Sequence, residues 1–438
     1  MLVGTGVLTA EAVARCVAVG ELGLDASIRP VRGALSIARM VAGDRTPPRT
    51  LVLPWPNVSE AALVSDLALA APRTLGELVG WLRSGEMPSP APRIAVTAPS
   101  ELPDLSDVAG QDGAKRALAI AAAGAHGLLL VGPPGAGKTM LARRLPTILP
   151  ALTSAEALEV TAIHSVAGML SASSGAVAQR PFRAPHHSIS TAGLVGGGSM
   201  PRPGEVSLAH HGVLFLDELL EFPRFVLEAL RQPMEDGTVT ISRAHASLRF
   251  PARFALAAAM NPCPCGHAGD PTHPCVCAAA EVARYRARLS GPLADRIDLH
   301  VNVPPVALTR LAARDTCDAS SAVRTRVEHA RHRQRVRYGN DEACNARAPG
   351  RWLETHGSVE PTARLLLTSA GERLHLSARA FHRVLRVART IADLDGEASV
   401  TTPHIAEALG YRPRNNEPRA DADRATSGGT AGSAGDHR

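Results

Sequence analysis

The stretch GLLLVGPPGAGKTMLARRL, residues 127–145, decides the fold predicted for this chain. Its four apolar residues Leu128 to Val131 are typical of a buried strand, and the segment GPPGAGKT (132–139) leads from that strand into a helical pattern. A strand, a glycine-rich loop and a helix in this order form a P-loop, in which backbone N–H groups wrap phosphate groups at a helix N-terminus. The stretch therefore predicts an α/β domain that binds a nucleotide.

The residue types at the end of this loop fit phosphate chemistry. Lys138 would reach the outer phosphates, and the hydroxyl of Thr139 would bind Mg²⁺. The chain has 47 lysines and arginines, of which only Lys115 and Lys138 are lysines. A lysine kept in so arginine-rich a chain fits a position that needs a compact point charge.

An acidic pair follows a second apolar run. In GVLFLDE (212–218), a buried strand ends at Asp217 and Glu218. Downstream of a P-loop, this pattern predicts that Asp217 holds Mg²⁺ through water and that Glu218 orients and deprotonates the attacking water.

A third apolar run, FALAAAMN (254–261), ends at Asn261. In open α/β sheets, ligands bind beyond the carboxyl ends of the strands. Asn261 is therefore expected to point at the γ-phosphate or the lytic water. The alternative is an asparagine that only forms the turn before Pro262.

The amino-acid composition favours some classes of protein and disfavours others. The chain has 438 residues, 45% hydrophobic and 20% charged, which suits two or three globular domains. No apolar run approaches the roughly 18 residues of a membrane helix, and the N-terminus has no basic leader, so a cytoplasmic protein without membrane contact is expected. The net charge of +6 suits a polyanionic partner without requiring one, while 3% aromatic residues disfavour base-stacking platforms.

Composition also changes along the chain in a way that predicts its organisation. Residues 1–85 are typical of a small α/β unit, and the proline-rich residues 86–103 of a linker. Residues 104–305 alternate strands and helices, as in a mostly parallel sheet covered on both faces, and residues 306–411 carry helical periodicity. The polar residues 412–438 are expected to form a disordered tail.

Four of the seven cysteines cluster in NPCPCGHAGDPTHPCVC (261–277) as two Cys-x-Cys pairs: Cys263, Cys265, Cys275 and Cys277. Four thiolates suit a structural Zn²⁺ site, although Cys-x₂-Cys spacing is more usual, and His267 or His273 could substitute as ligands. Reduced thiols without a metal are the alternative, and disulfides are the weakest one in a reducing compartment. A zinc here would brace the loop directly behind Asn261.

Further motifs carry a family resemblance over about residues 17–411. They are DVAGQDGAKRAL (107–118), RPFRAPHHS (180–188), GEVSLAHHGVLFLDEL (204–219), SGPLADRIDLH (290–300) and LSARAFHRVLRVARTIADL (376–394). With the P-loop, they resemble the magnesium-chelatase-like branch of AAA+ ATPases, and more closely the ComM (YifB) family, which is linked to DNA processing in natural transformation.

The resemblance implies an AAA+ P-loop core with a parallel sheet, followed by a C-terminal helical lid domain. It also implies a Lon-protease-like domain of S5 fold in front. GELGLDASIRPVRGALSIARMV (20–41) matches the middle of that domain, so residues 1–85 are expected to be a partial one. Proteolysis is not expected, because a Ser-Lys dyad needs a lysine and residues 1–114 contain none.

The resemblance further implies roles for single residues. Asn261 would be the first sensor, Arg296 an arginine finger that reaches the γ-phosphate of a neighbouring subunit, and Arg379 the second sensor, with Arg383 as the alternative. The active form would be a hexameric ring. The residues implied to contact the nucleotide are Val108, Gly110, Gln111, Gly132, Pro133, Pro134, Gly135, Ala136, Gly137, Lys138, Thr139 and Met140.

Two glycine-bounded stretches, GLVGGGSMPRPGE (193–205) and DGTVTISRAHASLRFP (236–251), resemble pore-lining hairpins. Their basic residues could contact a phosphate backbone or could lie on ordinary solvated turns. These residues are Arg202, Arg243, His245 and Arg249.

These expectations combine into an ATP- and Mg²⁺-dependent ring motor on single-stranded or branched DNA, as a helicase or branch-migration enzyme. One alternative is the motor subunit of a magnesium or cobalt chelatase, which shares the ATPase core. Another is an ATP-binding interaction protein with impaired assembly, although the intact Lys138, Asp217 and Glu218 argue against lost chemistry.

Overall fold

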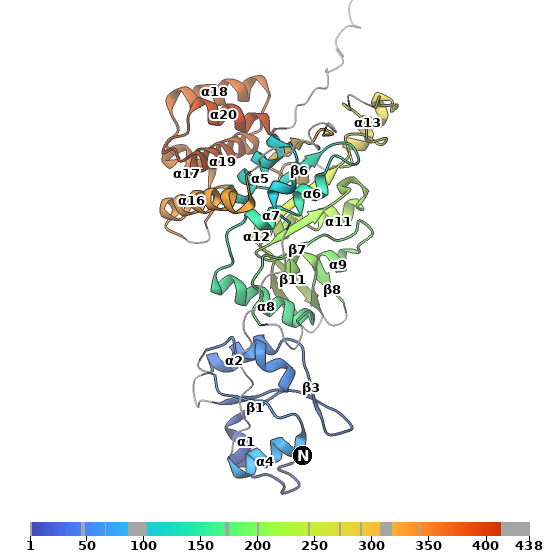
Figure 1. Cartoon of the computed structure of the whole chain (residues 1–438), viewed down its shortest axis with the longest axis vertical. Coiled ribbons are helices and arrows are strands. Elements are labelled where there is room, and N and C mark those ends of the chain that lie inside the picture. Colours follow the sequence, from blue (N-terminus) through green and yellow to red (C-terminus); the bar gives the residue numbers. More distant parts are fainter. Residues whose placement is uncertain are drawn as a thin grey trace, which may run out of the picture.

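A computed structural model describes residues 2–44, 49–65, 67–85, 103–170, 175–198, 201–243, 246–270, 273–289, 291–306, 318–340 and 343–412. Figure 1 shows an N-terminal unit in blue, a central α/β domain in cyan to yellow, and a helical region in orange and red. The predicted linker up to residue 102 and the predicted tail from residue 413 lie outside the described residues.

The N-terminal unit contains a three-stranded parallel sheet of order β1-β4-β5. The apolar side chains of this sheet and of its helices form a separate core. Its elements are α1 (Ala10–Ala14), β1 (Cys16–Ala18), β2 (Glu21–Leu22), β3 (Ile28–Arg29), α2 (Ala34–Gly43), β4 (Thr50–Val52), η1 (Trp55–Asn57), α3 (Val58–Ala61), β5 (Leu69–Ala70) and α4 (Leu75–Ser84). The described residues of this unit form both strands and helices, and its likeness to a Lon-type domain stays a prediction.

The central domain is built on five parallel strands in the order β14-β6-β13-β10-β7. These strands are β6 (Leu128–Val131), β7 (Phe182–Arg183), β10 (Val213–Leu216), β13 (Ala255–Met260) and β14 (Leu299–Asn302). The α/β fold with a parallel sheet is thereby confirmed, and the strand that precedes the P-loop lies inside the sheet.

Burial of both sheet faces explains why these strands are continuously apolar. Leu128 and Leu130 of β6 join one core, which also holds α5 (Asp112–Gly124), whereas Leu129 joins a second core on the other face. All three side chains are buried. In the register of the sheet, Val131 pairs with Met260, and Leu216 pairs with Ala258, so the carboxyl ends of β6, β10 and β13 share one edge.

The rest of the central domain surrounds this sheet. Both predicted hairpins form, β8 with β9 and β11 with β12, each as an antiparallel pair. The elements are η2 (Leu105–Asp107), α6 (Lys138–Ala142), α7 (Leu145–Ile148), α8 (Ser154–Ala167), α9 (Thr191–Val195), β8 (Gly196–Gly197), β9 (Arg202–Pro203), α10 (Glu205–Leu208), η3 (Leu219–Glu221), α11 (Arg224–Glu228), α12 (Arg231–Asp236), β11 (Thr238–Arg243), β12 (Ala246–Pro251), α13 (Ala279–Arg286) and α14 (Gly291–Ala294).

The C-terminal region is helical, as predicted. It consists of α16 (Ser320–Tyr338), η4 (Asn345–Arg347), α17 (Gly350–His356), α18 (Pro361–Arg373), α19 (Ala378–Asp395) and α20 (Thr402–Gly410). Helices α16 and α19 pack against α5 of the central domain, so the two regions share one apolar core. Within the described residues, no helix combines the length and the apolar character needed to cross a membrane.

Candidate functional site

The P-loop connects β6 to α6 at the carboxyl edge of the sheet. Gly135 and Gly137 have φ values of +78° and +87°, a conformation that residues with a Cβ rarely adopt. Gly137 is the N-cap of α6, so that helix begins at Lys138. The glycines therefore turn the chain so that backbone N–H groups at the start of α6 are presented at the loop. The predicted residues Gly132, Pro133, Pro134, Gly135, Ala136, Gly137, Lys138, Thr139 and Met140 all lie on this one connection.

The Lys138 side chain lies inside the loop. Its Nζ donates hydrogen bonds to the carbonyl oxygens of Gly132 (2.7 Å) and Pro133 (2.9 Å) and to Oδ1 of Asn261 (3.2 Å). Burial lowers the pKa of Lys138, and the charges of Asp217 and Glu218 oppose that shift. The structure thus brings the lysine of the loop, the acidic pair and Asn261 together, as the sequence predicted.

A hydrogen bond joins the two predicted Mg²⁺ ligands. Thr139 Oγ1 donates to Asp217 Oδ2 at 2.6 Å, and Asp217 Oδ1 accepts from the backbone N–H of Glu218 at 3.0 Å. A hydroxyl and a carboxylate side by side supply the oxygen ligands that Mg²⁺ prefers, and phosphate oxygens and water would complete its shell.

Glu218 has a partner that was not predicted. Its side chain is 59% exposed, and its Oε2 lies 3.3 Å from Nδ1 of His187. His187 also lies edge-on against Phe222. His187 follows β7, the neighbour of β10, so the two carboxyl ends bring these side chains together. The motif RPFRAPHHS contains two adjacent histidines, but nothing in the sequence showed which of them contacts Glu218.

Gln111 ties the segment 108–111, which the resemblance implies to contact the nucleotide, to the P-loop, and Lys115 holds the backbone of that segment. Lys115 Nζ donates a hydrogen bond to the carbonyl oxygen of the buried Val108. Gln111 Nε2 donates to the carbonyl oxygens of Pro304 (2.7 Å) and Ala136 (3.3 Å). The second lysine of the chain therefore holds the backbone of this segment, a role that the sequence did not reveal.

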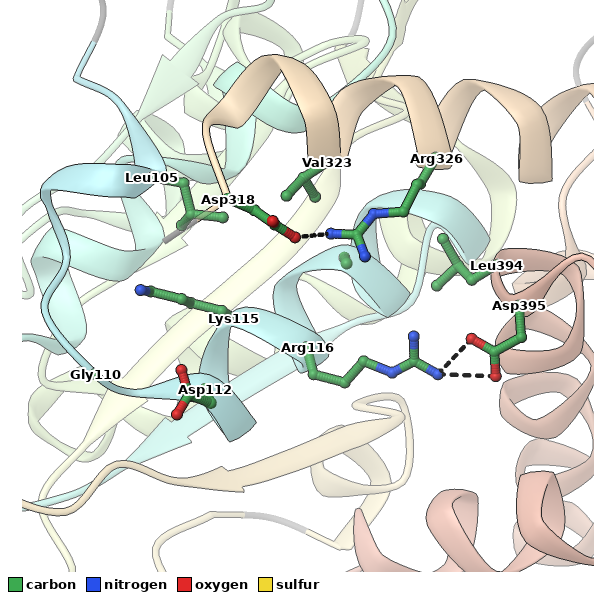
Figure 2. Close-up of a pocket in the computed structure, with 11 residues that line it drawn as sticks. Leu105, Gly110, Asp112, Lys115, Arg116, Asp318, Val323, Arg326, Leu394 and Asp395 are labelled. Carbon is green, nitrogen blue, oxygen red and sulfur yellow. Dashed lines mark hydrogen bonds and ion pairs between the residues drawn. The ribbon is translucent and has the colours of Figure 1, made fainter. Parts of the chain in front are cut away.

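A cavity of about 540 Å³ lies beside this segment, between the central domain and the helical region. Figure 2 shows Arg116 of α5 reaching Asp395 at the end of α19; both carboxylate oxygens accept from it, at 3.0 and 3.2 Å. Across the cavity Arg326 pairs with Asp318. Because these arginines are paired with acids, the cavity carries little net attraction for an anion, and Arg116 instead links the two regions.

Arg296 lies at the other edge of the sheet from the P-loop. The residues that follow it hydrogen-bond to Gly127, just before β6 begins: Asp298 N and Leu299 N donate to Gly127 O at 3.1 and 3.0 Å. The P-loop begins after β6 ends, and four strand residues span about 13 Å. Arg296 is largely buried and pairs with Glu235 of α12. Its own chain therefore does not bring this arginine to the P-loop.

The two candidates for the second sensor differ in burial. Arg383 is buried, with Nε 3.6 Å from Asp298 Oδ1 and Nη1 3.8 Å from Asp295 Oδ1. Arg379 is exposed one turn earlier on α19. Burial and the nearby charges of Arg231, Arg379 and Arg383 lower the pKa of Arg296. Arg296 and Arg379 thus lie in one arginine cluster, and Arg379 is the one whose side chain faces solvent.

The structure describes the side chains of only some of the basic residues expected on the hairpins. Arg202 of β9 and Arg249 of β12 are exposed. Arg243 ends β11, its side chain lies outside the described part of the structure, and His245 is outside it altogether. Contact between these residues and a phosphate backbone stays a prediction.

The cysteines of the loop after Asn261 converge. Among the described residues all cysteines are free thiols, so the disulfide alternative is not seen here. Cys263 Sγ lies 3.3 Å from Cys265 Sγ and 3.6 Å from Cys275 Sγ, and all four sulfur atoms, Cys277 included, lie within 4.8 Å of one another. Ala268 N donates to Cys263 Sγ at 3.2 Å.

These distances match a metal site. A tetrahedral zinc with Zn–S bonds of about 2.3 Å has sulfur atoms about 3.8 Å apart. Backbone N–H groups of His267 and Val276 lower the pKa of the Cys265 thiol to about 6, whereas burial and the neighbouring thiols raise the pKa of Cys275 and of Cys277. The histidines named as substitutes instead contact Asp270: His267 Nδ1 lies 3.2 Å and His273 Nδ1 3.4 Å from Asp270 Oδ2.

Glu159, His210 and His211 form another group of metal-binding residue types, at the amino end of β10. Both histidines approach Glu159 Oε2 with Nε2 at 3.0 Å. His210 Nδ1, however, accepts a hydrogen bond from Arg253 N at 3.0 Å, so its proton is on Nε2 and points at the carboxylate. A neutral imidazole in this tautomer has no lone pair for a metal, so this group is a hydrogen-bond network.

Comparison with known proteins agrees with this architecture. Residues 104–311 match the family model "Magnesium chelatase, subunit ChlI", and residues 317–412 match "Magnesium chelatase, subunit ChlI C-terminal". The chain is 45% identical to the competence protein ComM of Haemophilus influenzae over 404 residues, which is 90% of this chain and 77% of that protein.

Other relatives extend the comparison. An uncharacterized protein of Mycobacterium tuberculosis is 47% identical over 90% of this chain and 78% of its own length. YifB of Escherichia coli is 41% identical over 94% of this chain and 80% of its own length. The magnesium-chelatase 38 kDa subunit of Rhodobacter capsulatus is 25% identical over 71% of this chain and 88% of its own length.

Proposed function

The chain belongs to the ComM and YifB family of magnesium-chelatase-like AAA+ ATPases, and we propose that it is an ATP-driven ring motor that acts on DNA. The observation that carries the ATPase part is the convergence of four side chains from three adjacent strand ends. Lys138 and Thr139 follow β6, Asp217 follows β10, and Asn261 follows β13, and hydrogen bonds pair Lys138 with Asn261 and Thr139 with Asp217.

The chemistry follows from these positions. Mg²⁺, when bound, would be held by Thr139 and Asp217 and would neutralise charge on the phosphates. Lys138 places its charge on the outer phosphates as it exchanges the loop carbonyls for phosphate oxygens. Glu218 accepts the proton of the attacking water, with its carboxylate positioned by His187. Asn261 lies beside Lys138 and orients the water or the γ-phosphate.

In a ring, each subunit would supply the arginines that the neighbouring subunit does not bring to its own ATP. Arg296 lies at the end of the sheet away from its own P-loop, and the charge of Arg379 acts on it there. Both can act on a nucleotide only if that end of the sheet faces the P-loop of a neighbouring subunit. Arginine supplied to a phosphoryl-transfer site in this way typically raises the rate by about 10³–10⁵. We therefore assign both arginines to the neighbour's ATP in a closed ring, which the family resemblance makes a hexamer.

DNA is the proposed substrate of the motor. Two features support it: the relative named competence protein ComM covers 90% of this chain, and the chain carries a net charge of +6. The exposed Arg202 and Arg249 project from two hairpins of the central domain. In a ring these hairpins would track a phosphate backbone, which basic side chains bind independently of base sequence.

We also propose that Cys263, Cys265, Cys275 and Cys277 hold one structural Zn²⁺. The near-tetrahedral spacing of their sulfur atoms and the N–H groups directed at Cys263 and Cys265 support a closed four-thiolate site. Such a site has no open position for a substrate, so the metal would shape the loop and take no part in hydrolysis.

The test of the proposed function is ATP-dependent separation of a forked DNA duplex that carries a fluorophore and a quencher. The wild-type chain should separate the strands, and Glu218→Gln should not, although it binds DNA. Arg249→Ala should slow separation more than ATP turnover. Turnover without strand separation or branch migration on any fork would instead favour a chelatase-type motor, for which the match to the Rhodobacter capsulatus subunit is the supporting observation.

A further inference from the structure

We propose that the metal-bound cysteine loop, residues 261–277, supports the P-loop through a direct contact between Gly266 and Pro134, so that ATP affinity depends on this loop and its metal. The inference rests on the nucleotide and zinc sites proposed above and is independent of DNA. It makes Gly266 a positioning residue, since it acts on the nucleotide only through Pro134.

The contact between the two loops is tight. Gly266 has φ +86°, and a Cβ built on it would lie 2.6 Å from Cδ and 3.0 Å from Cγ of Pro134. Real Cβ atoms essentially never approach another heavy atom below 3.0 Å. Only glycine therefore lets the backbone of the cysteine loop pack directly against the ring of Pro134. Pro134 is one of the residues of GPPGAGKT, so the cysteine loop packs directly against the phosphate-binding loop.

Further contacts fix the start of the cysteine loop. At its start, Asn261 Oδ1 accepts the hydrogen bond from Lys138 Nζ at 3.2 Å. The next carbonyl, that of Pro262, accepts from Nε of Arg286 on α13 at 3.2 Å. Cys263 is fully buried and Cys275 lies beside it across the loop. The cysteine cluster thus closes a long loop whose near side contacts the P-loop at Lys138 and Pro134.

A metal is what would make this loop a rigid support. Closing a loop of this length costs conformational entropy, and a four-thiolate zinc contributes folding energy outright. With the metal in place, Gly266 holds Pro134 in the position that the wrapped phosphates need. Without the metal, the P-loop loses the packing contact at Pro134, and ATP must order the P-loop as it binds.

The chain itself offers a matched pair of variants. Gly266 and Gly269 lie in the same loop with φ +86° and +82°, and neither is a metal ligand. A Cβ on Gly269 would meet no heavy atom of the described residues within 4 Å. Gly266→Ala and Gly269→Ala therefore impose the same backbone strain, but only the first pushes on Pro134. ATP binding to the full-length chain, followed by fluorescence of a nucleotide analogue, and zinc per chain, measured by mass spectrometry, are the readouts.

We expect Gly266→Ala to weaken ATP binding about tenfold while it keeps its zinc, and Gly269→Ala to change binding less than twofold. In a Pro134→Ala background the effect of Gly266→Ala should shrink, since the clashing ring is gone. Removal of zinc by an organomercurial and a chelator should weaken ATP binding of the wild type by a similar factor. Equal effects of the two glycine variants, or ATP affinity indifferent to zinc removal, would overturn the proposal.

Discussion

Thr139 Oγ1 donates a hydrogen bond to Asp217 Oδ2 over 2.6 Å, although 78 positions separate the two residues in the sequence. The parallel pairing of β10 with β13 and of β13 with β6 creates this proximity, because it places the end of β10 two strands away from the P-loop. The pair consists of the two predicted Mg²⁺ ligands, and the adjacent Glu218, the proposed base, has a side chain that is 59% exposed.

Glu218→Gln should separate binding from hydrolysis. The variant keeps the Lys138–Asn261 and Thr139–Asp217 contacts, so ATP should bind within about twofold of wild type, whereas loss of the base should lower turnover by about 10²–10⁴. Nucleotide binding and phosphate release measure the two effects. Glu221→Gln, an exposed acid on η3, is the matched control. Turnover of the Glu218 variant above about half of wild type would remove Glu218 from the mechanism.

His187→Ala should lower kcat more than it raises KM. His187 contacts Glu218 at 3.3 Å, so its loss lets the carboxylate leave the orientation needed for proton transfer. We expect about a tenfold loss of kcat, the effect of a misoriented base. His329→Ala, an exposed histidine of α16, should leave both constants unchanged. A variant whose KM alone changes would place His187 in nucleotide binding instead.

Two inactive variants should restore activity when mixed. Lys138→Ala lacks a phosphate-binding lysine but has an intact Arg296, and Arg296→Ala has the reverse. If the arginine acts on the neighbour, mixed rings contain interfaces with both groups intact, and ATP turnover should rise well above that of either variant alone. Mixtures of Arg296→Ala with the wild-type chain, in which Lys138 and Arg296 are both present, calibrate subunit exchange. No recovery, with exchange demonstrated, would mean that Arg296 does not complete the neighbour's site.

Acidification should destabilise the fold through His210. Burial, followed by the charge of His211, lowers the pKa of His210 to about 4, whereas an unfolded histidine titrates near 6.5. Between these values the unfolded chain binds a proton that the folded chain does not, so stability falls as the pH falls through this window and is unaffected by this group above it.

Each such proton can contribute a slope of up to about 1.4 kcal/mol per pH unit. His210→Asn keeps an acceptor for Arg253 N but cannot titrate, so its unfolding midpoint should depend less on pH between 5 and 7. His300, whose pKa burial also lowers to about 4, keeps part of the slope. His329→Asn is the exposed control. An unchanged slope in the His210 variant would show that this residue takes up its proton when folded.

Features that depend on local sequence could be predicted. The four residues of β6, the run of β10 before Asp217 and the run of β13 before Asn261 are apolar because both faces of the sheet are buried. The runs of β10 and β13 end in polar residues, and β6 ends in the glycine-rich P-loop. Parallel strands place those ends at one edge of the sheet, so the residues that line the site could be predicted from the sequence.

Contacts that depend on distant register could not be predicted. His187 meets Glu218 because β7 pairs with β10, and Gly266 meets Pro134 because the cysteine loop folds back over the P-loop. The sequence likewise did not show that Arg379 and Arg383 differ in burial, since both carry the same charge on the same helix; the structure places the buried Arg383 beside Asp295 and Asp298 and leaves Arg379 exposed.

ATP turnover by the purified full-length chain, with and without single-stranded and forked DNA, tests the central claim most directly. Glu218→Gln serves as the blank. The account predicts a basal rate that DNA raises severalfold and that is absent from the blank, with the stimulation weakened by salt as phosphate contacts are screened. Turnover that is abolished in the blank but indifferent to every DNA added would contradict the claim that this ATPase is a motor on DNA.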